Sequence, residues 1–204
     1  VGRGTEIKLT KEIRFPHSLG LLYSAFTAFL GFEVNEGEYK VMGMAPYGEP
    51  KYVDKVWKLI KQFDDGSFRL DMDYFCFHRS TTRTYNRKFE ALFGEPRPPE
   101  MYFFTASTEY PSYFGAKPGN YDELCRINQH YADIAASVQQ VTEEVLLKMA
   151  RCLRSETGME SLCIAGGVGL NSVANGRILK ESGFERLYVQ PAAGDAGLAI
   201  GAGL

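Results

Sequence analysis

The sequence is poor in the features that would assign it to several common classes of protein. Only three of its 204 residues are histidine, and no two of them are spaced as H-x-x-x-H. One helix face therefore cannot supply a two-histidine metal site. The formal net charge is −2, which gives no general electrostatic argument for a nucleic-acid or membrane partner. No apolar run approaches the roughly 20 residues that span a bilayer.

Cysteine is also scarce, and its spacing is uninformative. The four cysteines are Cys76, Cys125, Cys152 and Cys163, and none of them form a C-x-x-C pair. A chain of this length can bury a sizeable core without disulfide bonds. We therefore expect four reduced thiols, as is typical of a cytoplasmic protein.

The two ends of the chain are unusual. Val1 is not a natural start, and the final LAIGAGL stops inside an apolar helical pattern. We therefore expect this sequence to be a piece of a longer protein.

The first part of the chain mixes short ordered segments with loops. Residues 5–15 alternate apolar and polar side chains, which predicts a strand, and residues 19–31 form an apolar helical pattern. Residues 32–50 are rich in Gly and Pro and predict a loop. Residues 51–63 have the pattern of an amphipathic helix, and residues 67–75 that of a strand.

The second part is more regular. Residues 97–120 are rich in Pro, Gly, Tyr and Phe and predict an irregular insertion. A long helix is expected over 127–156, a short buried strand over 161–165, a helix over 171–181 and another short strand over 185–189. This order of helices and strands predicts an α/β fold, with a mixed sheet flanked by helices.

Two loops have the position of a ligand site. GGVGLN and PAAGDAG each follow a predicted strand and precede a predicted helix. Such loops gather at the carboxyl ends of strands, and helix N-termini favour phosphate. GGVGLN matches neither the P-loop nor G-x-G-x-x-G, and tight helix–strand packing also uses glycine. Asp195, the carboxylate of the second loop, could be either a helix N-cap or a metal ligand.

Long stretches of the sequence resemble the nodulation-type O-carbamoyltransferase family. They are FPHSLGLLYSAFTAFLGFEVNEGEYKVMGMAPYG near the start, HYADIAASVQQVTEEVLLKMARCLRSETGMESLCIAGGVGLNSVANGRI, and VQPAAGDAGLAIGA near the end. Together they cover well over half of the chain, in order. The same blocks are more distantly similar to the threonylcarbamoyl-adenosine tRNA-modifying proteins. Both groups belong to the actin/hexokinase-like ATPase superfamily.

The resemblance implies a fold and a reaction. Residues 1–204 would be the C-terminal, nucleotide-binding part of an actin-like carbamoyltransferase domain. An adenylate-forming domain of the same full-length chain would make carbamoyl-adenylate from ATP and carbamoyl phosphate. The actin-like domain would then transfer the carbamoyl group to the hydroxyl of a small-molecule acceptor. A divalent metal, which is iron in some relatives, would assist as a Lewis acid.

The resemblance also assigns roles to residues of the two loops. Gly166 and Gly167 would let the backbone approach the nucleotide closely. Asn171 would hydrogen-bond the nucleotide's sugar or phosphate. Asp195 would be a metal ligand.

A second nucleotide-facing segment would be EGEYKVMGMAPYG. Its candidates are Glu38, Lys40 and Gly48, where Lys40 could neutralise phosphate or be an ordinary exposed lysine. His130 is expected to be a polar residue that faces solvent rather than a catalyst. The resemblance identifies no catalytic residue in this chain.

The family's metal-binding histidine pair lies upstream of the matching region, so we expect this piece to be inactive alone. Two other functions stay open from the sequence. One is a noncatalytic, actin-like ATP-binding module that regulates or assembles a partner, because fold does not determine function. The other is a relative of the tRNA threonylcarbamoyl transferases, which the near-neutral charge does not support.

Overall fold

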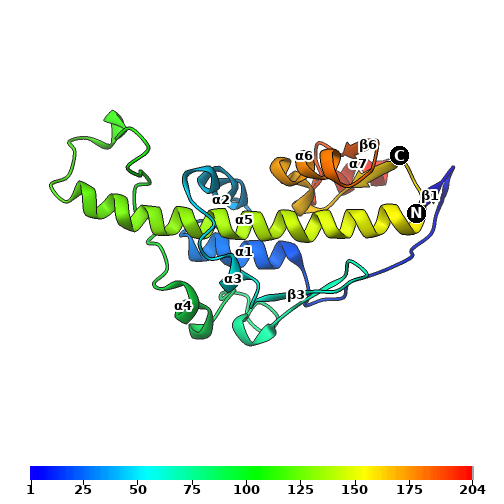
Figure 1. Ribbon diagram of the computed structural model, residues 1–204, viewed down its shortest axis with the longest axis horizontal. Coiled ribbons are helices and arrows are strands. Elements are labelled where there is room, and N and C mark those ends of the chain that lie inside the picture. The colour runs from blue at the N-terminus through cyan, green and yellow to red at the C-terminus, as the bar shows by residue number, and fades with distance from the viewer. Residues whose placement is uncertain (204) are drawn as a thin grey trace. The chain divides into compact units, whose positions relative to one another are not determined.

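The computed structural model describes residues 1–203, which fall into two compact units. The first unit contains residues 1–20, residues 60–70 and the chain from Thr142 onward, and the second contains residues 21–59 and 71–141. Helix α5 (Tyr121–Thr157), green to yellow in Figure 1, begins in the second unit and ends in the first. The predicted long helix is confirmed and starts earlier than its apolar pattern indicates.

The core of the second unit is an aromatic cluster between helices α1 (Leu19–Phe29) and α4 (Arg87–Phe93). The ring centroid of Phe26 lies 5.0 Å from that of Phe89 and 5.1 Å from that of Phe93, in edge-to-face geometry. All three rings are buried. Helix α1 is apolar on nearly every face, as is typical of a buried helix, and its prediction from sequence is confirmed.

The segment predicted as a loop over residues 32–50 contains helix α2 (Glu38–Met44), which continues as a 3-10 turn over Ala45–Tyr47. The loop prediction is therefore wrong for these residues. Val41 and Met44 are buried three residues apart, so the helix is stabilised by packing of one face. Pro46 is compatible with the start of the turn, where a missing N–H is tolerated.

The predicted helix over residues 51–63 is reduced to one turn, α3 (Val53–Val56). The chain then enters strand β3 (Ile60–Gln62), which pairs antiparallel with β4 (Phe68–Leu70). The Asp65 carboxylate accepts hydrogen bonds from the amide and hydroxyl of Ser67 and closes the turn between the strands. Pairing of the strands satisfies backbone groups that a longer helix would have used, so tertiary structure overrides the helical period.

In the first unit, strands β5 (Ser161–Ile164) and β6 (Arg186–Val189) pair in parallel, and helix α6 (Ser172–Glu181) connects them. Helix α7 (Gly197–Gly203) follows the loop after β6. The cluster beneath these strands comprises Ala150, Ile178 and Phe184, with the partly buried Leu146, Leu153, Met159, Leu162 and Ile164 packed against it. The strand predicted over 161–165 is confirmed, but its predicted burial is wrong, because residues of β5 alternate between exposed and half-buried.

The structure combines helices with small sheets, in agreement with the predicted α/β class. Within residues 1–203, however, the strands form three separate two-stranded sheets rather than one mixed sheet. The first is a hairpin of β1 (Gly2–Arg3) and β2 (Glu6–Ile7). The strand predicted over 5–15 is wrong beyond Ile7, because this segment lacks a partner strand and Leu9 is 77% exposed. Pairing is local in the two hairpins, and only β5 and β6 pair across a helix.

Residues 97–120 have irregular backbone apart from one 3-10 turn, Ser112–Phe114. Aromatic rings pack against one another along this segment. The ring of Tyr102 stacks on that of Phe114 with centroids 4.1 Å apart, and Phe104 stacks on Tyr121 at 5.2 Å. Stacking of rings thus takes the place of regular hydrogen bonding in ordering this part of the chain.

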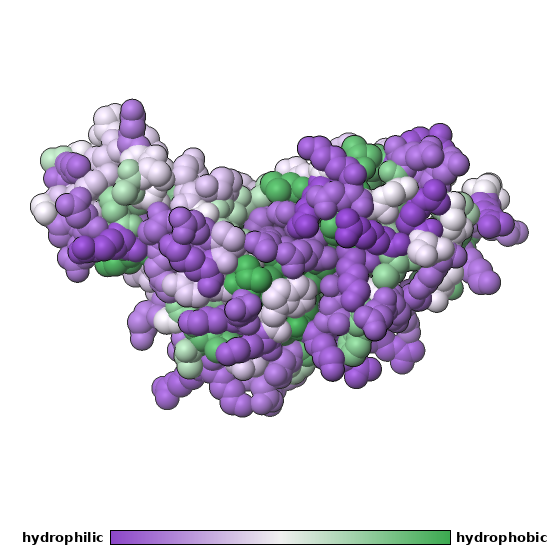
Figure 2. Space-filling view, viewed as in Figure 1, coloured by the Kyte–Doolittle hydropathy of each residue, from purple (hydrophilic) through white to green (hydrophobic). Residues whose placement is uncertain are grey.

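The face shown in Figure 2 is mainly hydrophilic, and its hydrophobic residues lie in separate patches. Scattered apolar residues of this kind are normal on protein surfaces. None of the helices within residues 1–203 combines the length and apolarity that crossing a bilayer requires.

Candidate functional site

The loops that follow β5 and β6 lie side by side. The amide of Gly166, in the loop after β5, donates a hydrogen bond of 2.7 Å to the carbonyl oxygen of Ala193, in the loop after β6. Because β5 and β6 are parallel neighbours, both loops leave the same edge of their sheet. The prediction that GGVGLN and PAAGDAG form adjacent loops is confirmed.

The two adjacent glycines of the first loop have different structural roles. Gly166 has φ 97° and ψ 160°, a backbone conformation that is essentially restricted to glycine. Gly167 has no such restriction, and a β-carbon placed on it would meet no atom within 4 Å. Both residues are exposed. Backbone conformation therefore explains Gly166, whereas the open space at Gly167 is compatible with close approach of a ligand.

Asn171 is the N-cap of helix α6 in the structure. Its side-chain oxygen accepts a hydrogen bond of 3.1 Å from the amide of Ala174. The side chain of Asn175, one turn later, donates to the carbonyl oxygen of Gly169 at 2.7 Å. These bonds attach the loop after β5 to α6. The N-terminus of α6 therefore lies beside this loop, and a helix N-terminus favours binding of an anion.

Asp195 is exposed in the second loop, two residues before α7 begins. Its carboxylate makes no hydrogen bond or ion pair with any residue that the structure describes, so the N-cap alternative has no support there. A free, exposed carboxylate fits the role of one ligand to a hard divalent cation. Among residues 1–203, no group of three or more His, Cys, Asp or Glu side chains is arranged to hold a metal ion. Asp195 could thus supply only part of a coordination sphere from within this segment.

The remaining sequence candidates, Glu38, Lys40 and Gly48, belong to the second unit. The Glu38 carboxylate accepts hydrogen bonds from the Ser24 hydroxyl at 2.8 Å and from the Asn35 amide at 3.0 Å. It therefore joins the start of α2 to α1. Lys40 is exposed, with its ammonium 5.7 Å from the ring centroid of Phe32. Its charge remains accessible to an anionic group.

Gly48 lies directly against helix α5. A β-carbon at this position would collide with the carbonyl group of Ala132. Glycine is therefore needed here for close packing of two backbones, whether or not a ligand is also near. The contact fixes the point at which the chain after α2 crosses α5.

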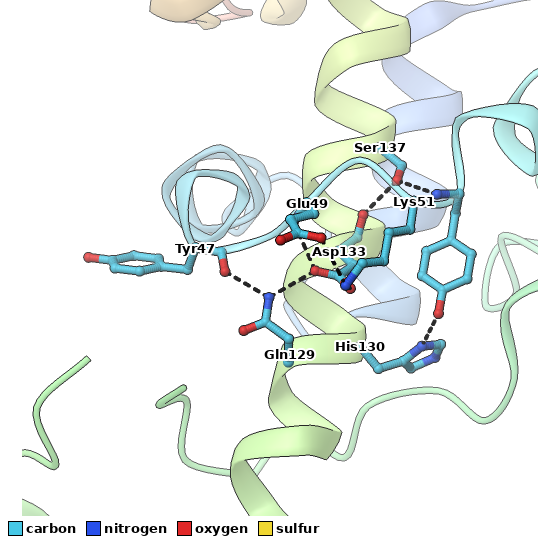
Figure 3. A network of polar contacts seen from close by, with 8 residues as sticks. Tyr47, Glu49, Lys51, Gln129, His130, Asp133 and Ser137 are labelled. Carbon is cyan, nitrogen blue, oxygen red and sulfur yellow. Dashed lines mark hydrogen bonds and ion pairs between the residues drawn. The ribbon is translucent and has the colours of Figure 1, made fainter. Parts of the chain in front are cut away.

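A polar network that was not predicted from the sequence surrounds this crossing (Figure 3). Its centre is Asp133, whose side chain is only 5% exposed. One carboxylate oxygen accepts hydrogen bonds from the Glu49 amide at 2.9 Å and from the Gln129 side chain at 2.8 Å. The other oxygen pairs with the Lys51 ammonium at 2.9 Å. A buried carboxylate is tolerated when it is paired and hydrogen-bonded in this way.

The same face of α5 also binds both ends of the segment from Tyr47 to Tyr52, which crosses the helix. Gln129 donates to the carbonyl oxygen of Tyr47 at 2.9 Å, and the hydroxyl of Ser137 accepts from the amide of Tyr52 at 2.9 Å. Gln129, Asp133 and Ser137 are spaced by four residues, so they lie on one face of the helix. This polar stripe was readable in the sequence, but its partners lie about 80 residues away and could not be inferred from it.

His130 is a part of this network rather than a solvent-facing residue, so that expectation is wrong. Its side chain is half-buried. Nδ1 lies 2.8 Å from the Tyr52 hydroxyl, and Nε2 lies 2.8 Å from the carbonyl oxygen of Phe93. A carbonyl can only accept, so Nε2 donates to Phe93, and Nδ1 shares the second hydrogen bond with the Tyr52 hydroxyl.

The electrostatics of the network favour its charged form. Burial is the largest single influence on Asp133 and acts to raise the pKa of its carboxyl group. The hydrogen bonds from Glu49, Gln129 and Lys51 outweigh burial and hold this pKa below its ordinary value. The pKa of Lys51 is raised, chiefly by its hydrogen bond to Asp133. The two shifts agree and keep the pair ionised near neutral pH.

The comparison with known proteins covers the entire chain. Residues 1–204 match the model of the family described as carbamoyltransferase N-terminus. The chain is 50% identical over 204 residues to an uncharacterized protein of Synechocystis. It is 35% identical over 210 residues to nodulation protein NolO of Bradyrhizobium diazoefficiens and 33% identical over 205 residues to nodulation protein NolNO of Sinorhizobium fredii.

Each of these matches includes 100% of this chain but only 29%, 31% and 25% of the respective relative. The chain thus spans less than a third of the length of these relatives. The resemblance of the sequence blocks to the nodulation-type family is confirmed by the family model and by the two nodulation proteins. The chain belongs to the carbamoyltransferase N-terminus family.

Proposed function

We propose that the full-length protein is an ATP-dependent O-carbamoyltransferase, and that this chain supplies nucleotide binding and one metal ligand. The observation that carries the proposal is the pair of loops after β5 and β6, joined by the bond from Gly166 to Ala193. They lie at the carboxyl ends of parallel strands in a chain of the carbamoyltransferase family. The open space at Gly167 and the unpaired carboxylate of Asp195 lie on these two loops.

The chemistry requires an activated carbamoyl donor. In the proposed reaction, the acceptor's hydroxyl oxygen attacks the carbamoyl carbon of carbamoyl-adenylate. A carbon–oxygen bond to the acceptor forms, the carbon–oxygen bond to the phosphate breaks, the hydroxyl proton is lost and AMP leaves. Phosphate is a good leaving group, which makes an otherwise unreactive carbamoyl group transferable. A divalent metal, where bound, would polarise the carbonyl group.

The residues have distinct parts in this scheme. The backbone at Gly166 and Gly167 would pass close to the adenylate, and Asn171 would contact its sugar or phosphate at the N-terminus of α6. The candidates for nucleotide contact in the second unit are Lys40, which would offer a positive charge, and the segment that contains Gly48. Among the residues that the structure describes, we assign none as the general base that would accept the hydroxyl proton.

The test is to identify the product of the full-length protein. It is incubated with ATP, carbamoyl phosphate and a set of hydroxyl-bearing sugars and metabolites, and mass spectrometry detects carbamoylated species. We expect a product that disappears when either ATP or carbamoyl phosphate is omitted. ATP binding without any carbamoylated product would support a noncatalytic ATP-binding module instead. A modified tRNA nucleoside as the product would support the tRNA threonylcarbamoyl alternative.

A further inference from the structure

We propose that Asp133 is a positioning residue for nucleotide binding, which holds the segment from Tyr47 to Lys51 in the shape that receives the adenylate. The inference rests on the proposed function, in which the segment that contains Gly48 contributes to nucleotide binding. Asp133 itself would not touch the ligand. It would act through the backbone of Glu49 and the side chain of Lys51 (Figure 3).

Asp133 is buried, whereas the segment residues that it binds are exposed. The carboxylate is 5% exposed, whereas Tyr47, Glu49 and Lys51 are exposed residues. An exposed segment of this length normally samples several conformations, and ordering it reduces conformational entropy. Three hydrogen-bond donors converge on one carboxylate here, and two of them come from the segment itself. The arrangement therefore restrains the segment more than it packs the core.

The restraint is also directional. The contact between Gly48 and Ala132 fixes how closely the segment approaches α5. The bond from the Glu49 amide to Asp133 then fixes the orientation of the peptide group that follows Gly48. A binding segment that is already ordered loses less entropy when its ligand arrives, so its affinity is higher. This predicts that removal of the carboxylate weakens nucleotide binding without removing any group that contacts the nucleotide.

The experiment uses full-length protein and 8-azido-AMP as a photoreactive probe. After irradiation, mass spectrometry of proteolytic peptides reports labelling of residues 38–51 and 166–171 separately from labelling elsewhere in the chain. The probe concentration for half-maximal labelling of residues 38–51 measures the affinity of the segment that Asp133 is proposed to hold. Asp133→Asn and Asp133→Ala are compared with Asp73→Asn. Asp73 is an exposed carboxylate of the same unit that pairs with Lys88 at 2.8 Å, so its variant is the matched control.

We expect half-maximal labelling to require about tenfold more probe in Asp133→Ala, the loss that one hydrogen bond to a charged group corresponds to. Asp133→Asn should show a smaller shift, because its side-chain oxygen can still accept from Glu49. Asp73→Asn should match the wild type. A purely structural role would instead lower the maximal labelling, in proportion to unfolded protein, at an unchanged half-maximal concentration.

Failure of the proposed role of Asp133 can be distinguished from failure of the proposed function. Saturable labelling of wild type and Asp133→Ala at the same probe concentration would overturn the role of Asp133 and leave the proposed function intact. Absence of saturable labelling of both peptides in the wild type would overturn the proposed nucleotide site itself. Circular dichroism of each variant at the labelling temperature shows whether it is folded. If Asp133→Ala is unfolded, the comparison of Asp133→Asn with the wild type tests the role of Asp133.

Discussion

The amide of Gly166 and the carbonyl oxygen of Ala193 are joined by a hydrogen bond of 2.7 Å, which ties the loop after β5 to the loop after β6. This bond spans 27 residues of sequence and joins the two loops that we propose to bind the ligand. It places the backbone of Gly167 and the carboxylate of Asp195 on neighbouring loops. Substitutions at these residues can separate what they do for the fold from what they would do for a ligand.

Gly166 and Gly167 should respond differently to alanine. Gly166→Ala places a side chain in a backbone conformation that glycine alone adopts readily, at a cost of about 1–3 kcal/mol. Gly167→Ala meets no neighbouring atom, so the free energy of unfolding should change by less than about 0.5 kcal/mol. Urea unfolding of both variants measures this difference. If the nucleotide occupies the space at Gly167, this variant alone should lose AMP affinity while keeping its stability.

Asn171→Ser separates capping from ligand binding. Serine caps helices about as well as asparagine, so α6 should keep its stability, whereas Asn171→Ala should lose about 1 kcal/mol. Serine lacks the side-chain amide with which Asn171 would contact the nucleotide. We therefore expect Asn171→Ser to unfold at the wild-type urea concentration and to bind AMP more weakly. Wild-type affinity in this variant would show that Asn171 is only a cap.

Gly48→Ala and Gly43→Ala form a matched pair in the second unit. A methyl group at residue 48 would collide with Ala132, so we expect destabilisation of about 1–3 kcal/mol. Gly43 is an exposed residue inside α2 with open space around its α-carbon. Alanine is the better helix former, so Gly43→Ala should stabilise by up to about 1 kcal/mol. Thermal unfolding measures both, and equal effects would contradict the packing described at Gly48.

Asp133 should make the fold sensitive to acid. Its pKa in the folded protein is held below the value of about 3.9 that an unfolded aspartate has. The stabilisation is therefore complete above the unfolded pKa and is lost as the pH falls through the lower, folded pKa. Unfolding measured from pH 6 down to pH 2 should lose stability less steeply in Asp133→Asn than in the wild type. The pKa of the exposed Asp73 is also lowered, chiefly by its hydrogen bond to Lys88, but solvent and salt screen this pair, so Asp73→Asn should follow the wild-type profile more closely than Asp133→Asn does.

The sequence predicted best where the pattern was long or was marked by capping residues. The apolar stripe of α5 extends over many turns, so its period is unambiguous. Asn171 and Gly183 mark the ends of α6, and the structure places the helix between them. The sequence predicted poorly where distant pairing decides the outcome. Residues 60–62 carry a helical period but pair as a strand with residues 68–70.

The candidate site shows the same division. The two loops could be located from the sequence because each follows a short strand and precedes a helix. That Gly166 requires its positive φ, whereas Gly167 does not, depends on backbone geometry that no residue type reveals. Asp133 was missed because its role comes from Glu49 and Lys51, which are more than 80 residues away in the chain.

We propose that these loops hold nucleotide and metal for carbamoyl transfer, and Asp195→Asn in the full-length protein is the most direct test. Bound metal and carbamoyl transfer are measured on one preparation, with Asp64→Asn, another exposed carboxylate of the first unit, as the control. Asparagine keeps the size of aspartate but lacks the charge that a hard cation prefers. The proposed role of Asp195 predicts that metal content and transfer fall together in Asp195→Asn while the melting temperature of the metal-free protein stays the same. Unchanged metal content and unchanged transfer would contradict it.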